Sequence, residues 1–218
     1  MKPLIIFGTG SMARVLYSFM RKQHKIVGFC ADDEFVTGKT FMGLPLYKFS
    51  QLPHSKFNIA MAIGYHDMNE RRAKRFADIK ALRIPVTGFI CKKLLHHDNV
   101  VINGTAIIYD GVAIHAGSAV HENAFISSNV SIGHDCDIGA HAWINSGVSL
   151  AGGVTVGQRC VLGINSSVAQ GVTLGEGTFV GANALVTKDT EAGAVIVAQP
   201  SEAIAMDSKR FTQLTGQP

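Results

Sequence analysis

Aliphatic side chains recur at every sixth position through the second half of the chain. Fifteen successive positions of this series hold Ile, Leu or Val without a break. Two positions before each of them the residue is small or β-branched, and the position directly after is often Gly. The aliphatic series is Ile102, Ile108, Ile114, Val120, Ile126, Ile132, Ile138, Ile144, Leu150, Val156, Leu162, Val168, Leu174, Val180 and Val186.

This period of six predicts a parallel β-helix built from hexapeptide repeats. Each hexad supplies one short strand and a turn, and three hexads close one triangular coil. The aliphatic residue and its small partner both point inward, because side chains alternate along a strand. Residues eighteen apart should stack on neighbouring coils about 4.8 Å apart, so five coils make a rod of about 24 Å.

The N-terminal part shows a strand, a glycine turn and a helix. Residues 4–7 predict a buried strand, and the turn at 8–13 has the form G-x-G-x-x-[GA]. A second strand at 26–30 ends at Asp32 and Asp33, at the distance from the glycines where a ribose-binding acid is expected.

Further strands are expected near 44–46, 58–63 and 86–90, with a helix over about 69–82. These elements predict a small parallel α/β sheet of Rossmann-like type, with its crevice at the carboxyl ends of the strands. Glycines at 8 and 10 let a phosphate approach the backbone at a helix N-terminus. A nicotinamide cofactor, the diphosphate of a nucleotide-activated sugar and a turn without ligand all remain open, although the sheet is short for a full dinucleotide.

Composition changes near residue 98, from charged and helix-forming residues to Gly, Val, Ile and Ser. We therefore expect a Rossmann-like nucleotide-binding domain at 1–98, a β-helix at 99–200 and a C-terminal tail at 201–218. The net charge of +4 over 218 residues is mild, so no nucleic-acid partner is expected. No apolar run is long enough to enter and cross a membrane.

The four cysteines show no C-x-x-C pairing, which favours reduced thiols and a cytoplasmic protein. The densest basic run lies in a helical pattern that we interpret as a solvated helix face. Its members are Arg71, Arg72, Lys74, Arg75 and Lys80.

Because side chains fill the interior of the prism, reactive groups must lie at its outer corners. His134 follows Ile132 by two places and stands beside Asp135, and a histidine next to a carboxylate is a candidate general base. His115 should lie on the same corner one coil below, while His121 and His141 approach each other at the next corner. Zinc, as in γ-class carbonic anhydrases, needs four residues between two histidines, but six separate His134 from His141, so no metal is expected.

Both parts together resemble a group of bacterial sugar acyltransferases within the hexapeptide superfamily, the sialic-acid O-acetyltransferase-like proteins. Its best-understood members N-acetylate UDP-4-amino sugars for bacillosamine-type glycans. The resemblance covers roughly residues 3–200, where 197–201 occupies the place of the family's closing G-x-P-A. Its specific segments are 8–13, Asp32 with Asp33, 62–64, 132–139 and 163–166.

The resemblance implies a left-handed β-helix and a homotrimer, with acetyl-CoA lying in the groove between adjacent rods. It implies His134 as the general base, supported by Asp135. Acetyl-CoA would lie along Trp143, Gly152, Ile164 and Ala182. The nucleotide-sugar would contact Gly10, Ser11, Met12, Asp32, Asp33 and Gly64.

Three positions depart from the family pattern. Met12 stands where the family has a His that contacts the amino sugar, which leaves the substrate open. Trp143 replaces a His that commonly lines the CoA groove, and an indole can still pack on pantetheine. Ala182 replaces a Gly, which is a small change.

The predicted function is acyl-CoA-dependent sugar acylation. Its most specific form is direct N-acetylation, by acetyl-CoA, of the amino group of a nucleotide-linked amino-deoxy sugar, with His134 as base. O-acetylation of a sugar hydroxyl would use the same groups, and a longer acyl chain is open too. A non-catalytic, nucleotide-binding trimeric scaffold is the alternative of a different class.

Overall fold

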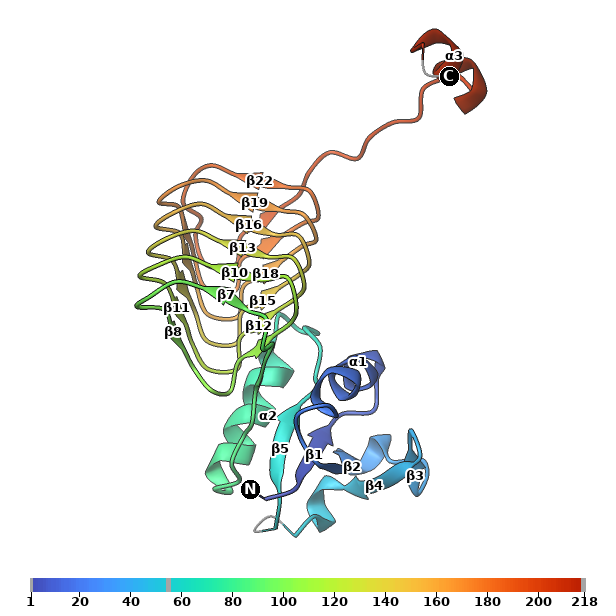
Figure 1. Ribbon diagram of the computed structural model, residues 1–218, viewed down its shortest axis with the longest axis vertical. Helices are drawn as coiled ribbons and strands as arrows, with labels where there is room; N and C mark the ends of the chain where they lie inside the picture. Colours follow the sequence, from blue (N-terminus) through green and yellow to red (C-terminus); the bar gives the residue numbers. More distant parts are fainter. Residues whose placement is uncertain (1, 54–55, 217–218) are drawn as a thin grey trace.

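The structure is a computed structural model that describes residues 2–53 and 56–216 of the chain. A triangular prism of stacked coils stands on a smaller part made of a sheet and helices, and the C-terminal segment leaves the far end of the prism (Figure 1). Strands of the prism run in parallel on each of its three faces. The stacking is consistent with the left-handed β-helix that the resemblance implied.

The three faces, numbered in chain order, hold seven, six and five strands. Face 1 consists of β6 (Phe89–Ile90), β9 (Ile107–Ile108), β12 (Phe125–Ile126), β15 (Trp143–Ile144), β18 (Val161–Leu162), β21 (Phe179–Val180) and β23 (Val195–Ile196). Face 2 consists of β7 (Leu95–His96), β10 (Ala113–Ile114), β13 (Ser131–Ile132), β16 (Ser149–Leu150), β19 (Ser167–Val168) and β22 (Leu185–Val186). Face 3 consists of β8 (Val101–Ile102), β11 (Ala119–Val120), β14 (Asp137–Ile138), β17 (Thr155–Val156) and β20 (Thr173–Leu174).

The predicted register is confirmed, because residues eighteen apart pair directly, as Ile114 does with Ile132 and Ile132 with Leu150. The inward orientation of the hexads is confirmed too. Ile132 and its partner Val130 are both buried, and the aliphatic and partner positions form one continuous core along the prism. Burial of this apolar column is the main favourable term in the stability of the prism.

Two separate backbone requirements shape the corners. The third residue after the aliphatic one has a positive φ at corner after corner, and Gly or Asn occupies most of these positions, although Asp135, His141 and Arg159 also adopt it. Glycine directly after the aliphatic residue has a different reason: a Cβ on Gly157 would lie 2.7 Å from the Leu174 carbonyl oxygen of the next coil.

The prism is longer than the five coils that the hexads predicted. It begins at Phe89–Ile90 (β6), which pairs with β9, and ends at Val195–Ile196 (β23), which pairs with β21. The sequence phase does continue back from Ile102 to Ile90, but His96 interrupts the aliphatic series between them. The expected strand at 86–90 is therefore divided, since Val86 bridges to Ile59 of the N-terminal sheet and β6 joins the prism.

The N-terminal part contains a mixed five-stranded sheet in the order β3-β4-β2-β1-β5. Neighbouring strands are parallel except for the antiparallel pair of β3 and β4. The four strands expected to begin at residues 4, 26, 44 and 58 are confirmed. The strands are β1 (Leu4–Phe7), β2 (Ile26–Ala31), β3 (Thr40–Phe41), β4 (Leu44–Lys48) and β5 (Asn58–Met61).

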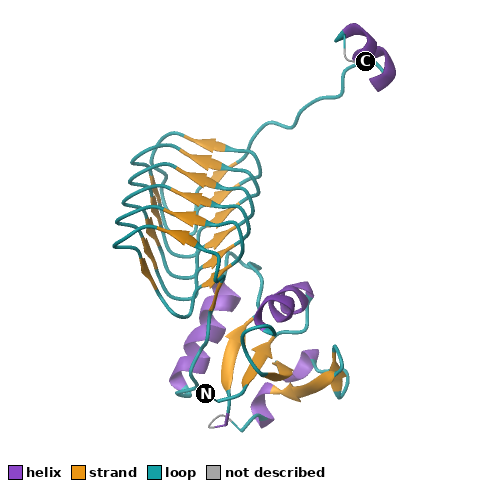
Figure 2. Ribbon diagram, in the orientation of Figure 1, coloured by secondary structure: helices purple, strands orange, loops and turns teal. Residues whose placement is uncertain are grey.

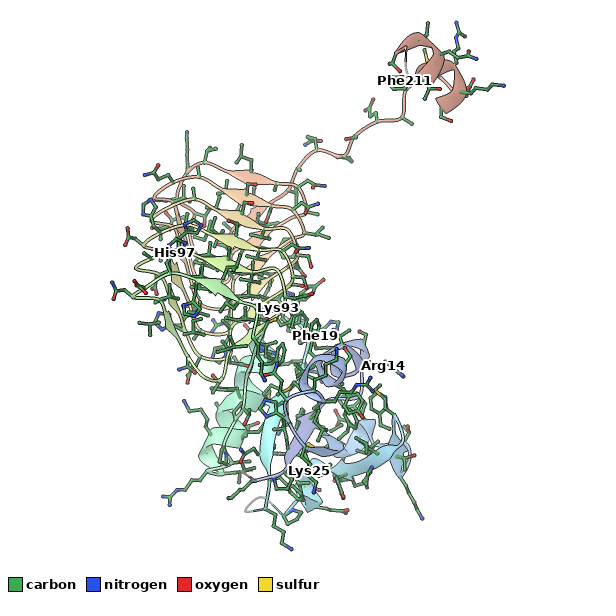
Figure 3. All side chains as sticks on the ribbon, viewed as in Figure 1. Arg14, Phe19, Lys25, Lys93, His97 and Phe211 are labelled. Atoms are coloured by element: carbon green, nitrogen blue, oxygen red, sulfur yellow. The ribbon has the colours of Figure 1, made fainter. Side chains whose placement is uncertain are left out.

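Helices cover both faces of this sheet (Figure 2). On one face α1 (Ser11–Met20) packs through Leu16 and Met20 against the sheet and also against face 1 of the prism. On the other face lie α2 (Glu70–Ala81) and the short 3₁₀ helices η1 (Asp33–Phe35) and η2 (Phe49–Gln51). Phe19 of α1 lies at the seam between the two parts, stacked on Tyr109 at 4.3 Å between ring centroids (Figure 3).

The C-terminal tail extends away from the prism and ends in α3 (Ser208–Leu214), whose residues are all exposed (Figure 1). Within the described residues, no helix has the length and apolar character needed to cross a bilayer. All four cysteines are free thiols.

Removing one central hexad side chain should destabilise the prism strongly. Ile144→Ala leaves a cavity among fully buried neighbours, and we expect a loss of about 2–5 kcal/mol in the free energy of unfolding, measured by denaturant titration. Ile102→Ala, at a partly buried position of the first coil, is the matched control and should cost less. Equal losses would contradict a core that is continuous through the middle coils.

Candidate active site

His134 and Asp135 lie on the vertex where face 2 turns into face 3. Asp135 adopts the left-handed corner conformation, with φ of 55°, and this turn directs the two side chains outward from the prism. His134 Nδ1 lies 2.8 Å from Asp135 Oδ2. Both side chains are largely exposed in the protomer, at 61% and 72%.

The other imidazole nitrogen of His134 lies over a glycine. A Cβ on Gly152, one coil further along the vertex, would stand 2.3 Å from His134 Nε2. In the tautomer that donates its Nδ1–H to Asp135, Nε2 has a free lone pair. In that tautomer Nε2 can accept a proton, and Gly152, predicted as a cofactor contact, leaves the room that the ring occupies.

Other histidines of the prism are engaged differently. His115 shares the vertex of His134, as predicted, but its ring stacks on His97 with the centroids 4.8 Å apart (Figure 3 labels His97). His121 Nε2 lies 2.6 Å from Asp137 Oδ1, whereas the half-buried His141 contacts Asn123. Among the described residues, no three His, Cys, Asp or Glu side chains are grouped to hold a metal ion.

A second candidate site is a cavity of about 380 Å³ at the carboxyl edge of the N-terminal sheet. The ends of β1, β2 and β5 reach it through Gly8, Ala31 and Ile63. Gly8 has a φ of 131°, and a Cβ there would lie 2.6 Å from the Ala62 carbonyl oxygen, so the strand ends approach closely only because of this glycine. The turn continues to Gly10, the residue that precedes the first turn of α1.

The two predicted acids at the end of β2 have different surroundings. Asp32 lines the cavity and forms an ion pair with Arg75 of α2 at 2.5 Å. Asp33 instead accepts hydrogen bonds from the hydroxyl and the backbone N–H of Ser50. The Ser50 hydroxyl is the main reason why the pKa of Asp33 lies below its ordinary value. Asp32 is thus the acid that faces the cavity.

The interpretation of the basic run as a solvated helix face holds for Arg71, Lys74 and Lys80, which are exposed, but not for the whole run. Arg71, Lys74 and Arg75 line the cavity, and Arg72 is fully buried. Positions 71, 74, 75 and 78 lie on one side of a helix, at spacings of three and four. That spacing was the available signal, and the proximity of this helix face to the end of β2 was not visible in the sequence.

Arg72 connects the cavity to the prism. Its guanidinium donates to the carbonyl oxygen of Ile63, at the cavity edge, and to that of Asn123, at the vertex between faces 3 and 1. Burial lowers the pKa of Arg72 to about 10, so the side chain stays charged at neutral pH. Asn69, also buried, donates to the Arg159 and Cys160 carbonyl oxygens of the same vertex.

The remaining predicted contacts are divided between the N-terminal part, its seam with the prism and the vertex between faces 1 and 2. Trp143 is 6% exposed, beneath the N-terminal part, and stacks on Phe125 with ring centroids 3.9 Å apart. Ile164 and Ala182 are exposed on the vertex between faces 1 and 2. Met12 packs at the seam, where its sulfur accepts from the Tyr109 hydroxyl at 3.6 Å. Ser11 begins α1, and Gly64 follows the cavity residue Ile63.

Topology separates the two candidate sites. The N-terminal part covers face 1, where the outward side chains Ile107, Phe125, Trp143 and Val161 are buried against it. Of the three vertices, only the one between faces 2 and 3 does not border face 1, and it carries His134. The cavity and the His134–Asp135 pair of one protomer therefore lie on opposite sides of the prism.

Two sequence-family models match the prism. One describes a bacterial transferase hexapeptide of six repeats and matches residues 153–188. The other describes the hexapeptide repeat of succinyl-transferase and matches residues 129–152. The second half of the chain therefore carries hexapeptide repeats of the kind found in bacterial transferases. No curated protein matches it in sequence.

Solved structures that include both parts of this hexapeptide-repeat protein are similar to it. PerB from Caulobacter crescentus, in complex with CoA and GDP-perosamine, has 26% identity and a TM-score of 0.81, over 92% of this chain and 96% of that one. The acetyltransferase domain of PglB from Neisseria gonorrhoeae has 20% identity and a TM-score of 0.80, over 94% and 100%. WeeI from Acinetobacter baumannii has 18% identity and a TM-score of 0.80, over 92% and 98%.

Acid should destabilise the protein through His141, a prism residue on which Phe76 of α2 packs with the ring centroids 5.5 Å apart. Asn123 Nδ2 donates to His141 Nδ1 at 2.8 Å, which requires a neutral acceptor nitrogen. Burial, and then the nearby Arg72, lower the pKa of His141 below 6.5. Unfolding therefore takes up a proton, and the free energy of unfolding falls as the pH drops below about 6.5 through the lowered pKa.

Denaturant titrations from pH 8 to pH 5 test this expectation. His141→Gln should flatten the acid limb of the stability profile. His24→Gln, outside the interface, should keep it. A His141→Gln protein with the unchanged slope would show that acid acts elsewhere.

Proposed function

We propose that the protein is an acetyl-CoA-dependent N-acetyltransferase that acts on the amino group of a nucleotide-linked amino-deoxy sugar. PerB supports this proposal, because at 26% identity over nearly the whole chain it holds CoA and the nucleotide amino sugar GDP-perosamine. The observation in this chain that carries it is the outward His134–Asp135 pair, whose Nε2 stands free above Gly152. The cavity behind Gly8 would serve as a Rossmann-like nucleotide site.

The chemistry is direct transfer. The sugar amine attacks the thioester carbonyl of acetyl-CoA, a carbon–nitrogen bond forms, and the carbon–sulfur bond breaks. His134 Nε2 accepts the proton that the amine loses, and this proton can then pass to the departing thiolate of CoA. Asp135 orients the ring through Nδ1. General-base catalysis of this kind contributes about 10²–10⁴-fold to the rate, and a backbone N–H would stabilise the oxyanion.

The same separation of sites supports the homotrimer that the resemblance implies. A sugar bound in the cavity of one protomer is turned away from the His134 of that protomer, so it would react at the His134 of a neighbour. The predicted acetyl-CoA contacts support the same arrangement. Gly152 lies on the vertex of His134, while Ile164 and Ala182 lie on another vertex, and only two adjacent prisms would bring both sets to one groove. A ring of three protomers with closed cyclic symmetry would contain three equivalent sites.

O-acetylation of a sugar hydroxyl would use the same base and the same groove. The amine is favoured by the Caulobacter structure, because perosamine is an amino sugar. A nucleotide-binding scaffold without catalysis needs no free imidazole at a shared groove. Release of free thiol from acetyl-CoA with nucleotide-linked amino sugars separates enzyme from scaffold.

Loss of the His134 imidazole should abolish most turnover. His134→Ala should lower kcat by about 10²–10⁴-fold, because the amine then loses its proton acceptor, while the sedimentation behaviour stays that of wild type. His121→Ala, at the second exposed histidine–aspartate pair, is the matched control and should keep its activity. Near-normal turnover of His134→Ala would reject the assignment.

Mixed oligomers test where the two halves of a site come from. His134→Ala and Asp32→Ala should each be inactive alone, the first in the base and the second in the nucleotide site. Unfolded together and refolded, they should recover roughly a quarter of wild-type activity, since random trimers contain sites built from two intact halves. Mixtures without any recovery would mean that each site belongs to a single protomer.

A further inference from the structure

The cavity at the carboxyl edge of the sheet has two walls of different charge. One wall is η1, with Glu34 and Phe35, and the other is one side of α2, with Arg71 and Lys74. Phe35 is 47% exposed, and the Arg71 guanidinium lies 5.7 Å from the centroid of its ring. An exposed ring at the edge of a polar cavity is a surface on which a planar ligand can stack.

The charges in the cavity are only partly paired. Arg75 forms ion pairs with Asp32 and with Asp78, at 2.5 and 3.3 Å, so these three groups satisfy one another. Among the described residues, no ion pair joins Glu34, Arg71 or Lys74 to another side chain. Glu34 is thus an unpaired carboxylate next to Phe35 in the chain, and Arg71 is an unpaired guanidinium that lies over the Phe35 ring.

The order of groups along the cavity assigns a part of the nucleotide to each. A diphosphate lies at the glycine turn after the first strand, and the acid at the end of the second strand binds the ribose. In this chain these are Gly8 and Asp32. The base then extends past Asp32 to the residues that follow it, which form η1. Glu34, Phe35 and Arg71 would then surround the base, and Lys74, one turn further along α2, would be available for the ribose or the phosphates.

We propose that this subsite recognises guanine, so that the acetyl acceptor is a GDP-linked amino sugar; this inference rests on the proposed function. Guanine presents adjacent N1–H and N2–H donors, which one carboxylate can accept in bidentate fashion, and acceptors O6 and N7, which arginine binds as a pair. Glu34 and Arg71 supply this acceptor and this donor beside the stacking ring.

Uracil and thymine do not complement the same groups. Their Watson–Crick edge places two carbonyl oxygens around a single N–H, so a carboxylate that accepts the N–H faces an oxygen on each side. An unpaired carbonyl against a carboxylate costs binding energy. The Glu34 carboxylate thereby selects against UDP and dTDP, in addition to its attraction for guanine.

Calorimetric titration of the full-length protein with GDP, IDP and UDP, without acetyl-CoA, tests the proposal. Inosine lacks only the N2 amine of guanine. We expect affinity to fall in the order GDP, IDP, UDP, with about 5- to 100-fold between GDP and UDP. Glu34→Gln should weaken GDP binding and bring GDP and IDP close together, and Arg71→Met should weaken both. Glu70→Gln, an exposed position of α2 outside the cavity, is the matched control.

Equal affinity for GDP and UDP, or a Glu34→Gln variant that binds GDP as the wild type does, would overturn the proposal. Acetyl transfer is then assayed separately with GDP- and UDP-linked amino sugars. Faster acetyl transfer to the UDP-linked sugar than to the GDP-linked sugar would reject guanine recognition and keep the proposed function. Preferred binding of GDP without any thiol release would reject the proposed function and keep guanine recognition.

Discussion

Hydrogen bonding between coils eighteen residues apart is the constraint on which the structure depends. Each short strand pairs with the strand above and the strand below, so a change of length in one hexad would shift every later residue out of phase. This regularity fixes which positions fill the core and which lie at corners. His134 owes its outward direction to this lattice, because Asp135 holds the left-handed turn and Gly152 leaves space on the coil above.

Docking of the N-terminal part is the second determinant of the site. Aromatic side chains on face 1, such as Phe125 and Trp143, are buried against α1 and its sheet, which gives the interface a large apolar area. The charged Arg72 orients the two parts relative to each other, since its guanidinium donates hydrogen bonds to the carbonyl oxygens of Ile63 and Asn123. Removing its side chain would leave both oxygens without a donor in a buried place, which is more costly than the bonds themselves are worth.

Sequence patterns that repeat were predictable, and contacts between distant segments were not. Fifteen hexads fixed the prism and its register, and the glycine turn located β1, α1 and the acid Asp32. The first coil was not predicted, because His96 stands at a position of the six-residue aliphatic series. The backbone nevertheless forms this coil, in which β6 and β7 pair with the next one. The basic run at 71–75 was interpreted only in part, for another reason: its cations also line a cavity, and Arg72 is buried. Helical spacing shows that these cations share a side, but whether that side meets solvent or the end of β2 depends on how α2 crosses the sheet.

The rigid seam also explains why the candidate site would be shared between subunits. A flexible linker could let a nucleotide-binding domain move its bound sugar around the prism to the His134 of its own chain. Here Asn69 and Arg72 donate to backbone carbonyl oxygens of the prism from buried positions, and the apolar seam spans several coils. Breaking these contacts in each turnover would expose that area and leave a buried charge unpartnered. A neighbouring prism that presents its own vertex to the fixed cavity would reach the same geometry without that cost, and catalysis would then take place only in the assembled oligomer.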